Sequence, residues 1–320
     1  MTTAYKAFDA NLQCRGFQFE VGKTYTHDGP VEACKGGFHA CESPMDVWDY
    51  YPIIQDDGTL TRYAEVEVAG DISREGDKLA AAQITIKAEL RLSDFVRLAV
   101  AAIIDATEGK SSACQNAQIG SRGDYDRIVS GGDFAKIVSD GNRVQISSSG
   151  YNAKIGSSGD SPRIVTSGHN SYIVTSGDYA RIVSGGDFAK IGSSGDCARI
   201  GSSGDGVQIG SSGSNAQIGY SGDCARIGSS GHYARIGSSG DNPRIGTSGD
   251  YAKVDCSGLD AVVAGSGRGS RVRGKVGTWI SLASFDNNGK CDGFGTGCIG
   301  QDGLEPDTWY RAEAGKLVKA

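Results

Sequence analysis

The chain has 320 residues, of which 49 are glycine and only 6 are proline, so the glycine excess indicates neither a collagen nor a proline-rich linker. A net charge of −6 argues against a general nucleic-acid-binding protein, and no apolar stretch is long enough for a membrane-spanning helix. The first residues lack the basic and apolar regions of a signal peptide, and nine scattered cysteines are typical of free thiols. These features predict a cytoplasmic protein of two or three domains.

Residues 1–110 are predicted to form an α+β domain that caps the repeat region. Strands are expected at Tyr5–Phe8, Gly16–Phe19, Tyr63–Val68 and Gln83–Ile86. Ser43, followed by Pro44 and then by Asp46, is typical of a helix start with Ser43 as the N-cap. A second helix, beginning at Ser93, is expected to place its apolar face over the first coil of the repeat.

A nine-residue repeat follows without interruption, and we predict that residues 111–273 form a β-solenoid. Ile or Val occupies 18 positions spaced by nine between Ile119 and Val272, and Gly occupies 17 positions with the same spacing between Gly123 and Gly267. A register this strict requires every unit to make the same contacts with its neighbours. Gly and Ser in every unit, with Ile and Val as the apolar residues, exclude a helix.

Each unit is expected to contain one short strand and one turn. Ala180 should share the inward face with Ile182, while Arg181 points outward. The Ser-Ser-Gly-Asp segment supplies the turn, where Gly is expected to adopt a positive φ. Nine residues cannot enclose a core, so two units should form one 18-residue coil, with about nine coils stacked about 4.8 Å apart. A three-sided coil, with one unit on each side, is the alternative.

Two rows of charged residues accompany the repeat. Asp recurs four residues before the apolar position, and Arg or Lys recurs one residue before it. Opposite charges in neighbouring rows would offset the repulsion within each row. Either the rows keep the solenoid soluble, or they form a regular surface that a partner recognises. Under the second hypothesis the candidate binding residues are Asp178, Asp187, Asp196, Asp205, Arg181, Lys190, Arg199, Arg226 and Arg235.

Aromatic residues recur three residues before the apolar position, as at Tyr179, Phe188 and Tyr233. They would be contact anchors if this position faces outward, and local packing if it lies at a corner. We include these three among the candidate binding residues.

The charge of the repeat region limits what it can mimic or bind. Residues 115–272 contain 14 Asp, no Glu and 15 basic residues, so the region is nearly neutral. Mimicry of duplex DNA would therefore require the Asp and Arg rows to face in different directions. Ice binding is disfavoured because the outward strand position carries Arg or Lys rather than Thr. The repeat resembles the nonapeptide β-roll of calcium-binding toxins, but its Asp lies four rather than two residues before the apolar residue, so no calcium site is predicted.

Residues 274–320 are expected to form a small β cap, which makes the whole chain mainly β. A strand is predicted at Trp279–Ala283, a hairpin turn at Asp286–Gly289, and a closing hairpin from Asp307–Tyr310 and Lys316–Val318. Self-association through this cap, giving a homo-oligomer, is a further hypothesis.

Both ends of the chain carry recognisable motifs. Cys14–Phe19, Gly22–Tyr25 and the segment Gly37–Pro44, which contains the letters GFHAC, together with Pro306–Tyr310 at the other end, resemble an uncharacterised family found in phages and prophages. Members share the GFHAC head, a variable nonapeptide middle and the PDTWY tail. The resemblance implies a bacterial cytoplasmic setting, in which such proteins bind and block a host factor, and it implies no particular activity.

The N-terminal domain also has a looser resemblance to ADP-ribosyltransferases. Gly37–His39, a helix with Trp48 and the strand Tyr63–Val66 are similar to the split sheet of that fold. The resemblance would place Arg15 and His39 at the nucleotide site, although the sequence contains no convincing catalytic Glu motif.

A metal site is a second chemical hypothesis for the N-terminal domain. Cys14, Cys34, His39 and Cys41 are ligand types that suit zinc, but their spacing matches no known zinc finger.

We therefore predict a non-enzymatic, phage-encoded interaction protein without a cofactor, whose solenoid binds a host protein or complex. Membrane and nucleic-acid partners are not expected. The alternatives are a transferase-like enzyme in the N-terminal domain and a structural component of the virion.

Overall fold

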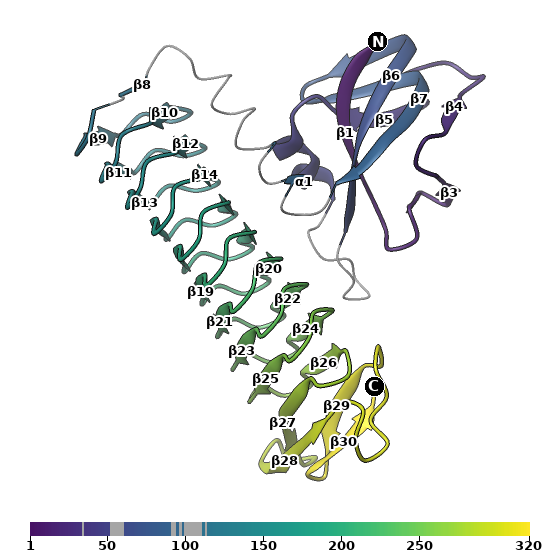
Figure 1. Cartoon of the computed structure of the whole chain (residues 1–320), viewed down its shortest axis with the longest axis vertical. Coiled ribbons are helices and arrows are strands. Elements are labelled where there is room, and N and C mark those ends of the chain that lie inside the picture. Colours follow the sequence, from purple (N-terminus) through teal and green to yellow (C-terminus); the bar gives the residue numbers. More distant parts are fainter. Residues whose placement is uncertain (34, 52–60, 91–93, 96–97, 99–110, 113) are drawn as a thin grey trace. The chain divides into compact units, whose positions relative to one another are not determined.

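The computed structural model describes most of the chain and divides it into two compact units, Met1–Ala102 and Ile103–Ala320. In Figure 1 the first unit is purple to blue and the second runs from teal to yellow. The described residues are 1–33, 35–51, 61–90, 94–95, 98, 111–112 and 114–320.

The N-terminal unit is built on an antiparallel sheet with the strand order β4-β7-β5-β1-β6. Because β6 also pairs with β7, the strands β1, β5, β7 and β6 close into a ring. The four strands predicted from the sequence coincide with β1, β3, β6 and β7, and β6 and β7 continue well beyond the prediction as a long hairpin. The strands are β1 (Thr2–Phe8), β2 (Gln13–Cys14), β3 (Phe17–Gln18), β4 (Thr24–Thr26), β5 (Phe38–Cys41), β6 (Arg62–Glu75) and β7 (Lys78–Leu90).

The core of this unit follows from the alternation of side chains along each strand. Ala64, Val66 and Val68 are fully buried on β6, and Ile84 and Ile86 are fully buried on β7. The residues between them are polar and point away from the core. The ring of strands therefore encloses one apolar interior, as the two-residue periodicity of the sequence requires.

Helical structure is scarce in the described part of the N-terminal unit. At the predicted helix start, a 3-10 turn η1 (Pro44–Asp46) leads into a single α-helical turn, α1 (Val47–Tyr50). Asp46 is the N-cap of α1 and makes no side-chain capping hydrogen bond, while the carbonyl oxygen of Ser43 accepts the Asp46 N–H at 3.2 Å. Most of the helix predicted from Ser93 lies outside the described residues.

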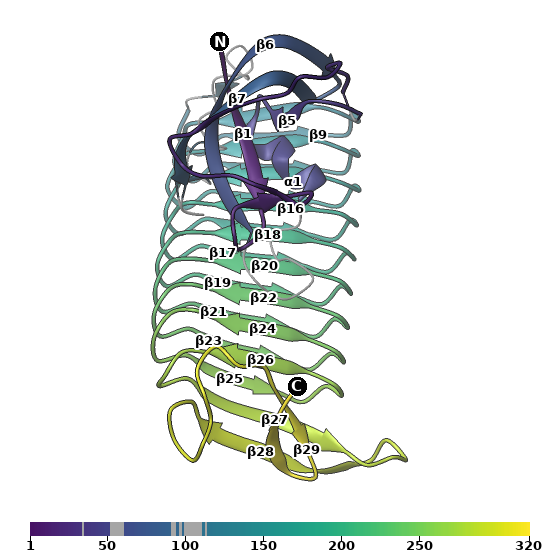
Figure 2. The same ribbon diagram turned by 90° about the vertical axis from the view of Figure 1, so that its right-hand side faces the viewer.

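The second unit is a β-solenoid in which each coil contributes one strand to each of two parallel sheets (Figure 2). Ile182 pairs with Ile200 in one sheet, and Ile191 pairs with Ile209 in the other, so residues 18 apart are neighbours. This register confirms the predicted coil of two units and excludes the three-sided coil. About nine coils lie between residues 118 and 282.

The even-numbered and odd-numbered strands form separate sheets, which we call the even sheet and the odd sheet. The even sheet contains β8 (Ser111–Ser112), β10 (Arg127–Ser130), β12 (Gln145–Ser148), β14 (Arg163–Thr166), β16 (Arg181–Ser184), β18 (Arg199–Ser202), β20 (Gln217–Tyr220), β22 (Arg235–Ser238), β24 (Lys253–Cys256) and β26 (Arg271–Gly274). The odd sheet contains β9 (Gln118–Ser121), β11 (Lys136–Ser139), β13 (Lys154–Ser157), β15 (Tyr172–Thr175), β17 (Lys190–Ser193), β19 (Gln208–Ser211), β21 (Arg226–Ser229), β23 (Arg244–Thr247), β25 (Val262–Gly265) and β27 (Trp279–Phe285).

The interior of the solenoid is made of three small or aliphatic positions from each unit. Ala180, Ile182 and Ser184 are all fully buried, and the same three positions are buried in most other coils. Burying one Ile contributes about 2 kcal/mol, so the repeated Ile column supplies a large part of the driving force. Tyr220 replaces the inner Ser in one coil, and its hydroxyl donates to the carbonyl oxygens of Gly204 and Asp223.

The repeated glycine serves a different purpose from the one predicted. It does not adopt a positive φ in the turn. Instead its Cα lies against the backbone of the preceding coil, and a Cβ added to Gly177 would lie 2.0 Å from the carbonyl oxygen of Gly159. From Gly132 to Gly267 the regularly spaced glycines are thus a requirement of coil stacking, because any side chain there would overlap the coil below.

The positive φ of each turn lies two residues after that glycine. Tyr179, Phe188 and Tyr233 have φ values of 57°, 55° and 58°. A non-glycine residue pays about 1 kcal/mol for this conformation. Hydrogen bonds between coils offset that cost, as when the N–H of Tyr179 donates to the carbonyl oxygen of Asp196 at 2.8 Å.

The odd sheet extends one strand beyond the strict repeat. Val263 pairs with Ile280, so the last coil is one residue shorter than the others and a count by nines does not detect this strand. Beyond it, β28 (Cys291–Cys298) pairs antiparallel with β27, and β29 (Tyr310–Glu313) pairs antiparallel with β26 and with β30 (Lys316–Lys319). Both sheets therefore end in antiparallel strands, as expected for a C-terminal β cap.

A pair of glycine substitutions tests the stacking role. Gly195→Ala places a methyl group 2.1 Å from the carbonyl oxygen of Gly177, so we expect it to lower the free energy of unfolding by about 1–3 kcal/mol. Gly210→Ala is the control, because nothing lies within 4 Å of a Cβ at that position. Urea unfolding followed by far-ultraviolet circular dichroism should show a lower midpoint for Gly195→Ala alone. Equal midpoints for the two variants would contradict the stacking role.

Candidate functional site

The row of aspartates binds successive coils together. The Oδ1 atom of Asp178 accepts the backbone N–H of Asp196 at 2.8 Å, and that of Asp187 accepts the N–H of Asp205 at 2.9 Å. The same bonds continue from Asp196 to Ser214 and from Asp205 to Asp223. All four aspartates that the sequence suggested as binding residues therefore staple one coil to the next, although they remain exposed.

Other residues take the same place in the row where their side chains offer an equivalent acceptor. The Oδ1 atom of Asn142 accepts the N–H of Asp160 at 2.8 Å, and the Nδ1 atom of His169 accepts the N–H of Asp187 at 3.1 Å. What these side chains share is a hydrogen-bond acceptor at one height, not a negative charge. The acceptor is thus the structural requirement of the position.

The basic row separates into two rows on opposite sheets. Arg181, Arg199 and Arg235 belong to strands of the even sheet, whereas Lys190 and Arg226 belong to strands of the odd sheet. Residues nine apart lie half a coil apart, so only those 18 apart stack on one face. The structure therefore does not bring the five predicted basic residues together on a single surface.

The candidate aromatic residues pack along the turns. A Cβ at Gly206 would lie 2.8 Å from the ring of Phe188, so that ring covers the glycine of the next coil. The ring of Tyr233 stacks on that of Tyr251 with centroids 5.2 Å apart. Tyr179, Phe188 and Tyr233 still expose more than half of their surface. They combine packing between neighbouring coils with an accessible ring face.

A long hollow lies on the outer face of the odd sheet, and we call it the odd-sheet trough. One part has a volume of about 790 Å³, and a second part of about 680 Å³ shares Val174, Gly192, Gly210 and Gly228 with it. The floor is a run of glycines at the position after each buried Ile: Gly192, Gly210, Gly228 and Gly246. At Gly210, Gly228 and Gly246 no atom lies within 4 Å of an added Cβ, so the space above this backbone is open.

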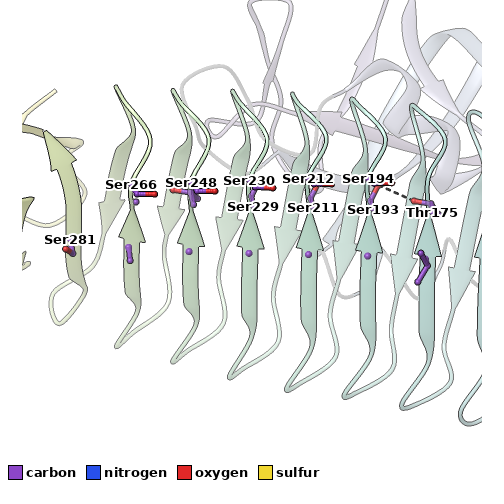
Figure 3. A pocket seen from close by; sticks show the side chains of 18 of the residues that line it. Thr175, Ser193, Ser194, Ser211, Ser212, Ser229, Ser230, Ser248, Ser266 and Ser281 are labelled. Carbon is purple, nitrogen blue, oxygen red and sulfur yellow. Dashed lines mark hydrogen bonds between the residues drawn. The ribbon is translucent and has the colours of Figure 1, made fainter. Parts of the chain in front are cut away.

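The two walls of the odd-sheet trough differ in chemistry. Figure 3 shows one wall, where Ser212, Ser230, Ser248 and Ser266 stand in a row across the strands. The other wall is basic and polar and consists of Lys190, Gln208, Arg226 and Arg244. The trough thus offers hydroxyls on one side and positive charge on the other.

Larger residues line the two ends of the trough. Tyr172 and Val174 stand on β15 at one end, and Ala264 on β25 and Phe294 on β28 stand at the other. The five strand spacings between β15 and β25 correspond to about 24 Å. Reading the sequence in steps of 18 rather than nine would have revealed the glycine run, because four successive odd strands carry Gly where earlier ones carry Val138 or Val174.

The three bases of the trough make no ion pair with a carboxylate of the described chain. Lys190, Arg226 and Arg244 have no carboxylate within 4 Å among these residues, and the nearby aspartates of the turns accept backbone N–H groups instead. Their charge is therefore available to a ligand in the trough.

The N-terminal unit contains its own cavity of about 560 Å³, which we call the N-terminal hollow. Cys14, Arg15, His39 and Cys41, all named by the sequence analysis, line it together. The β2–β3 hairpin presents Arg15 through a two-residue turn in which Arg15 and Gly16 both have positive φ. The structure thus gathers these four residues in one cavity.

A buried lysine forms part of the hollow, and sequence reasoning missed it. Lys6 is only 3% exposed, and its Nζ donates to the carbonyl oxygen of His39 at 2.8 Å and lies 3.5 Å from Cys14 Sγ. It occupies an inward position of β1 between the buried Ala4 and Phe8. A charged residue in phase with two apolar ones was the signal in the sequence.

The described residues do not form a metal site. No three His, Cys, Asp or Glu side chains among them are arranged to hold an ion, and Cys34 lies outside the described residues. Burial, followed by the charges of Asp46 and Asp77, raises the pKa of the Cys41 thiol to about 12, so at neutral pH it is not the thiolate that zinc requires. The eight described cysteines are free thiols.

Residues 2–98 match a protein family described as a domain of unknown function, DUF7666. No curated protein and no solved structure shows significant similarity to the chain. The described residues include no helix with the length and apolar character needed to cross a membrane.

The hydrogen-bonding role of the aspartate row can be tested at one position. Asp205→Ala removes the acceptor for the Asp223 N–H, and we expect it to reduce the free energy of unfolding by about 1 kcal/mol. Asp205→Asn keeps an oxygen acceptor, as Asn142 does naturally, and should restore most of that loss. Thermal melting of both variants provides the measurement. An Asn variant as unstable as the Ala variant would show that the charge, rather than the acceptor, matters.

Proposed function

We propose that this protein is a non-enzymatic binding protein whose odd-sheet trough holds an extended, acidic segment of a partner protein. The observation that carries the proposal is the glycine floor between a basic wall and a serine wall. In keeping with the family resemblance of its two ends, the partner would be a bacterial host protein or complex that a phage-encoded protein binds and inhibits.

The dimensions of the trough support an extended peptide. A length of about 24 Å matches seven or eight residues in extended conformation, at about 3.3 Å per residue. Without side chains on the floor, a peptide can approach the sheet closely, and the serine hydroxyls can donate to its carbonyl groups. A rigid sheet loses little conformational freedom when it binds, which favours recognition of a flexible segment.

The charges of the trough favour an acidic partner. Lys190, Arg226 and Arg244 recur along one wall without an ion pair to the described chain, so an acidic segment would neutralise charges that lack a carboxylate partner. Because the wall is exposed, these contacts should contribute specificity and a fast association rate more than affinity, and salt should weaken them.

A labelled peptide of eight glutamates tests the proposal by fluorescence anisotropy at low ionic strength. The double variant Arg226→Glu/Arg244→Glu should weaken binding at least tenfold, because it reverses the charge of the wall. Its matched control is Lys136→Glu/Lys154→Glu, which changes the net charge equally on the same sheet but outside the trough. A glutamine peptide of the same length should not bind.

Filling the floor gives a second, independent arm. Gly210→Val/Gly228→Val should also abolish peptide binding while leaving the fold intact, since Val138 and Val174 occupy the same position on other odd strands. If the wild-type protein fails to bind the peptide, or if the control double variant loses as much affinity as the trough variant, the proposed site is wrong.

A further inference from the structure

The N-terminal hollow gathers several positively charged side chains around one cavity. Lys6, Arg15, Lys35 and Lys78 line it, together with the imidazoles of His27 and His39. Lys35 pairs with Glu32 at 2.6 Å, outside the cavity. The ammonium of Lys78 lies over the ring of Tyr50, 3.6 Å from its centroid. Lys6, Arg15 and Lys78 are therefore the three cations nearest to a ligand.

The acidic residue in this lining is already engaged. Asp9 accepts the backbone N–H groups of Asn11 and Gln13 through its Oδ1 atom, at 2.9 and 2.8 Å. Those bonds stabilise the turn that leads into β2. No described carboxylate comes within ion-pair distance of Lys6, and the contacts of its Nζ are a carbonyl oxygen, a thiol and the Tyr51 hydroxyl at 3.4 Å. A buried ammonium without a carboxylate partner gains stability from an added anion.

The titration behaviour of the hollow is consistent with a positive potential. Burial lowers the pKa of His39, and the charges of Lys6, Arg15 and Lys78 lower it further. Burial also lowers the pKa of Lys6. An anion in the cavity would oppose both effects, because it favours the protonated form of each neighbouring base.

Aromatic rings line the cavity beside the charges. Phe17 contacts Phe19 and Phe38 with centroids 4.8 and 5.7 Å away, and Tyr50 and Tyr51 also belong to the lining. Phe17 exposes 44% of its surface even though it belongs to this cluster. An exposed ring held in place by other rings provides a face on which a planar ligand can stack.

From this arrangement we infer that the N-terminal hollow binds a small organic anion in which a planar ring is joined to a phosphate, as in a nucleoside monophosphate. Lys6, Arg15 and Lys78 contact the phosphate, whose several acceptor oxygens suit three cationic donors better than a single carboxylate does. Phe17 contacts the ring. The cavity volume of about 560 Å³ lies within the range of small-molecule sites. This site is separate from the odd-sheet trough and does not depend on it.

Isothermal titration of the full-length chain with 5′-AMP tests the inference, with adenosine and inorganic phosphate as partial ligands. AMP should bind with saturation, and each partial ligand should bind at least tenfold more weakly, because each supplies only the ring or only the charge. Arg15→Gln and Lys78→Gln should each weaken AMP binding at least fivefold. Phe17→Ala should weaken AMP and adenosine while leaving phosphate unchanged.

Lys87→Gln is the matched control, since Lys87 lies on β7 like Lys78, pairs with Glu67 at 3.1 Å and does not line the hollow. It removes the same charge and should leave AMP binding unchanged. Lys6→Met would remove the central charge, and its circular dichroism spectrum must first match that of the wild type. Absence of saturable AMP binding at millimolar concentration, adenosine binding as tight as AMP binding, or an equal loss in Lys87→Gln would each overturn the inference.

Discussion

The solenoid depends on how closely the backbone of each coil approaches the backbone of the preceding coil. In the strands this approach is an ordinary parallel ladder, which joins Ile182 to Ile200 and continues along both sheets. In the turns it is closer, because a glycine Cα rests on a carbonyl oxygen where no Cβ could fit. The aspartate side chains add a third contact between the same coils. Each of these contacts requires the same residue at the same height in every coil, which explains why the repeat tolerates no insertion.

This requirement also determines where the protein can vary. The inward Ala, Ile and Ser and the stacking Gly are constrained by the neighbouring coil, whereas the residue after the buried Ile points outward on the odd sheet. Valine and glycine both occur there, and their order along the odd sheet shapes its surface. Four glycines in succession produce a trough, and bulkier residues line its two ends. A binding surface can thus change without any change to the interactions that hold the coils together.

The two units solve the problem of buried polarity in different ways. The solenoid interior contains serine hydroxyls in a regular column, and its charges remain outside. The N-terminal unit buries the ammonium group of Lys6 inside a ring of strands, where a carbonyl oxygen accepts one of its protons. Burial of a charge is costly unless the charge has a function or a partner. That contrast is why the candidate small-molecule site lies in the N-terminal unit, while the solenoid offers an extended surface.

The sequence by itself determined the β-solenoid, the coil of two units and the identity of the inward residues, because these follow from spacing and residue type within a few units. It also located most strands of the N-terminal sheet and the C-terminal hairpins. It did not show that Arg181 and Lys190 lie on opposite sheets, since residues nine apart occupy equivalent places in the repeat but are half a coil apart in space. Nor did it show the true role of the glycine, which depends on a contact with the preceding coil. Only the tertiary structure gathered Lys6, Arg15 and Lys78 in one hollow, because their proximity depends on how β1, the β2–β3 hairpin and β7 are arranged, and no local pattern of residues specifies that arrangement.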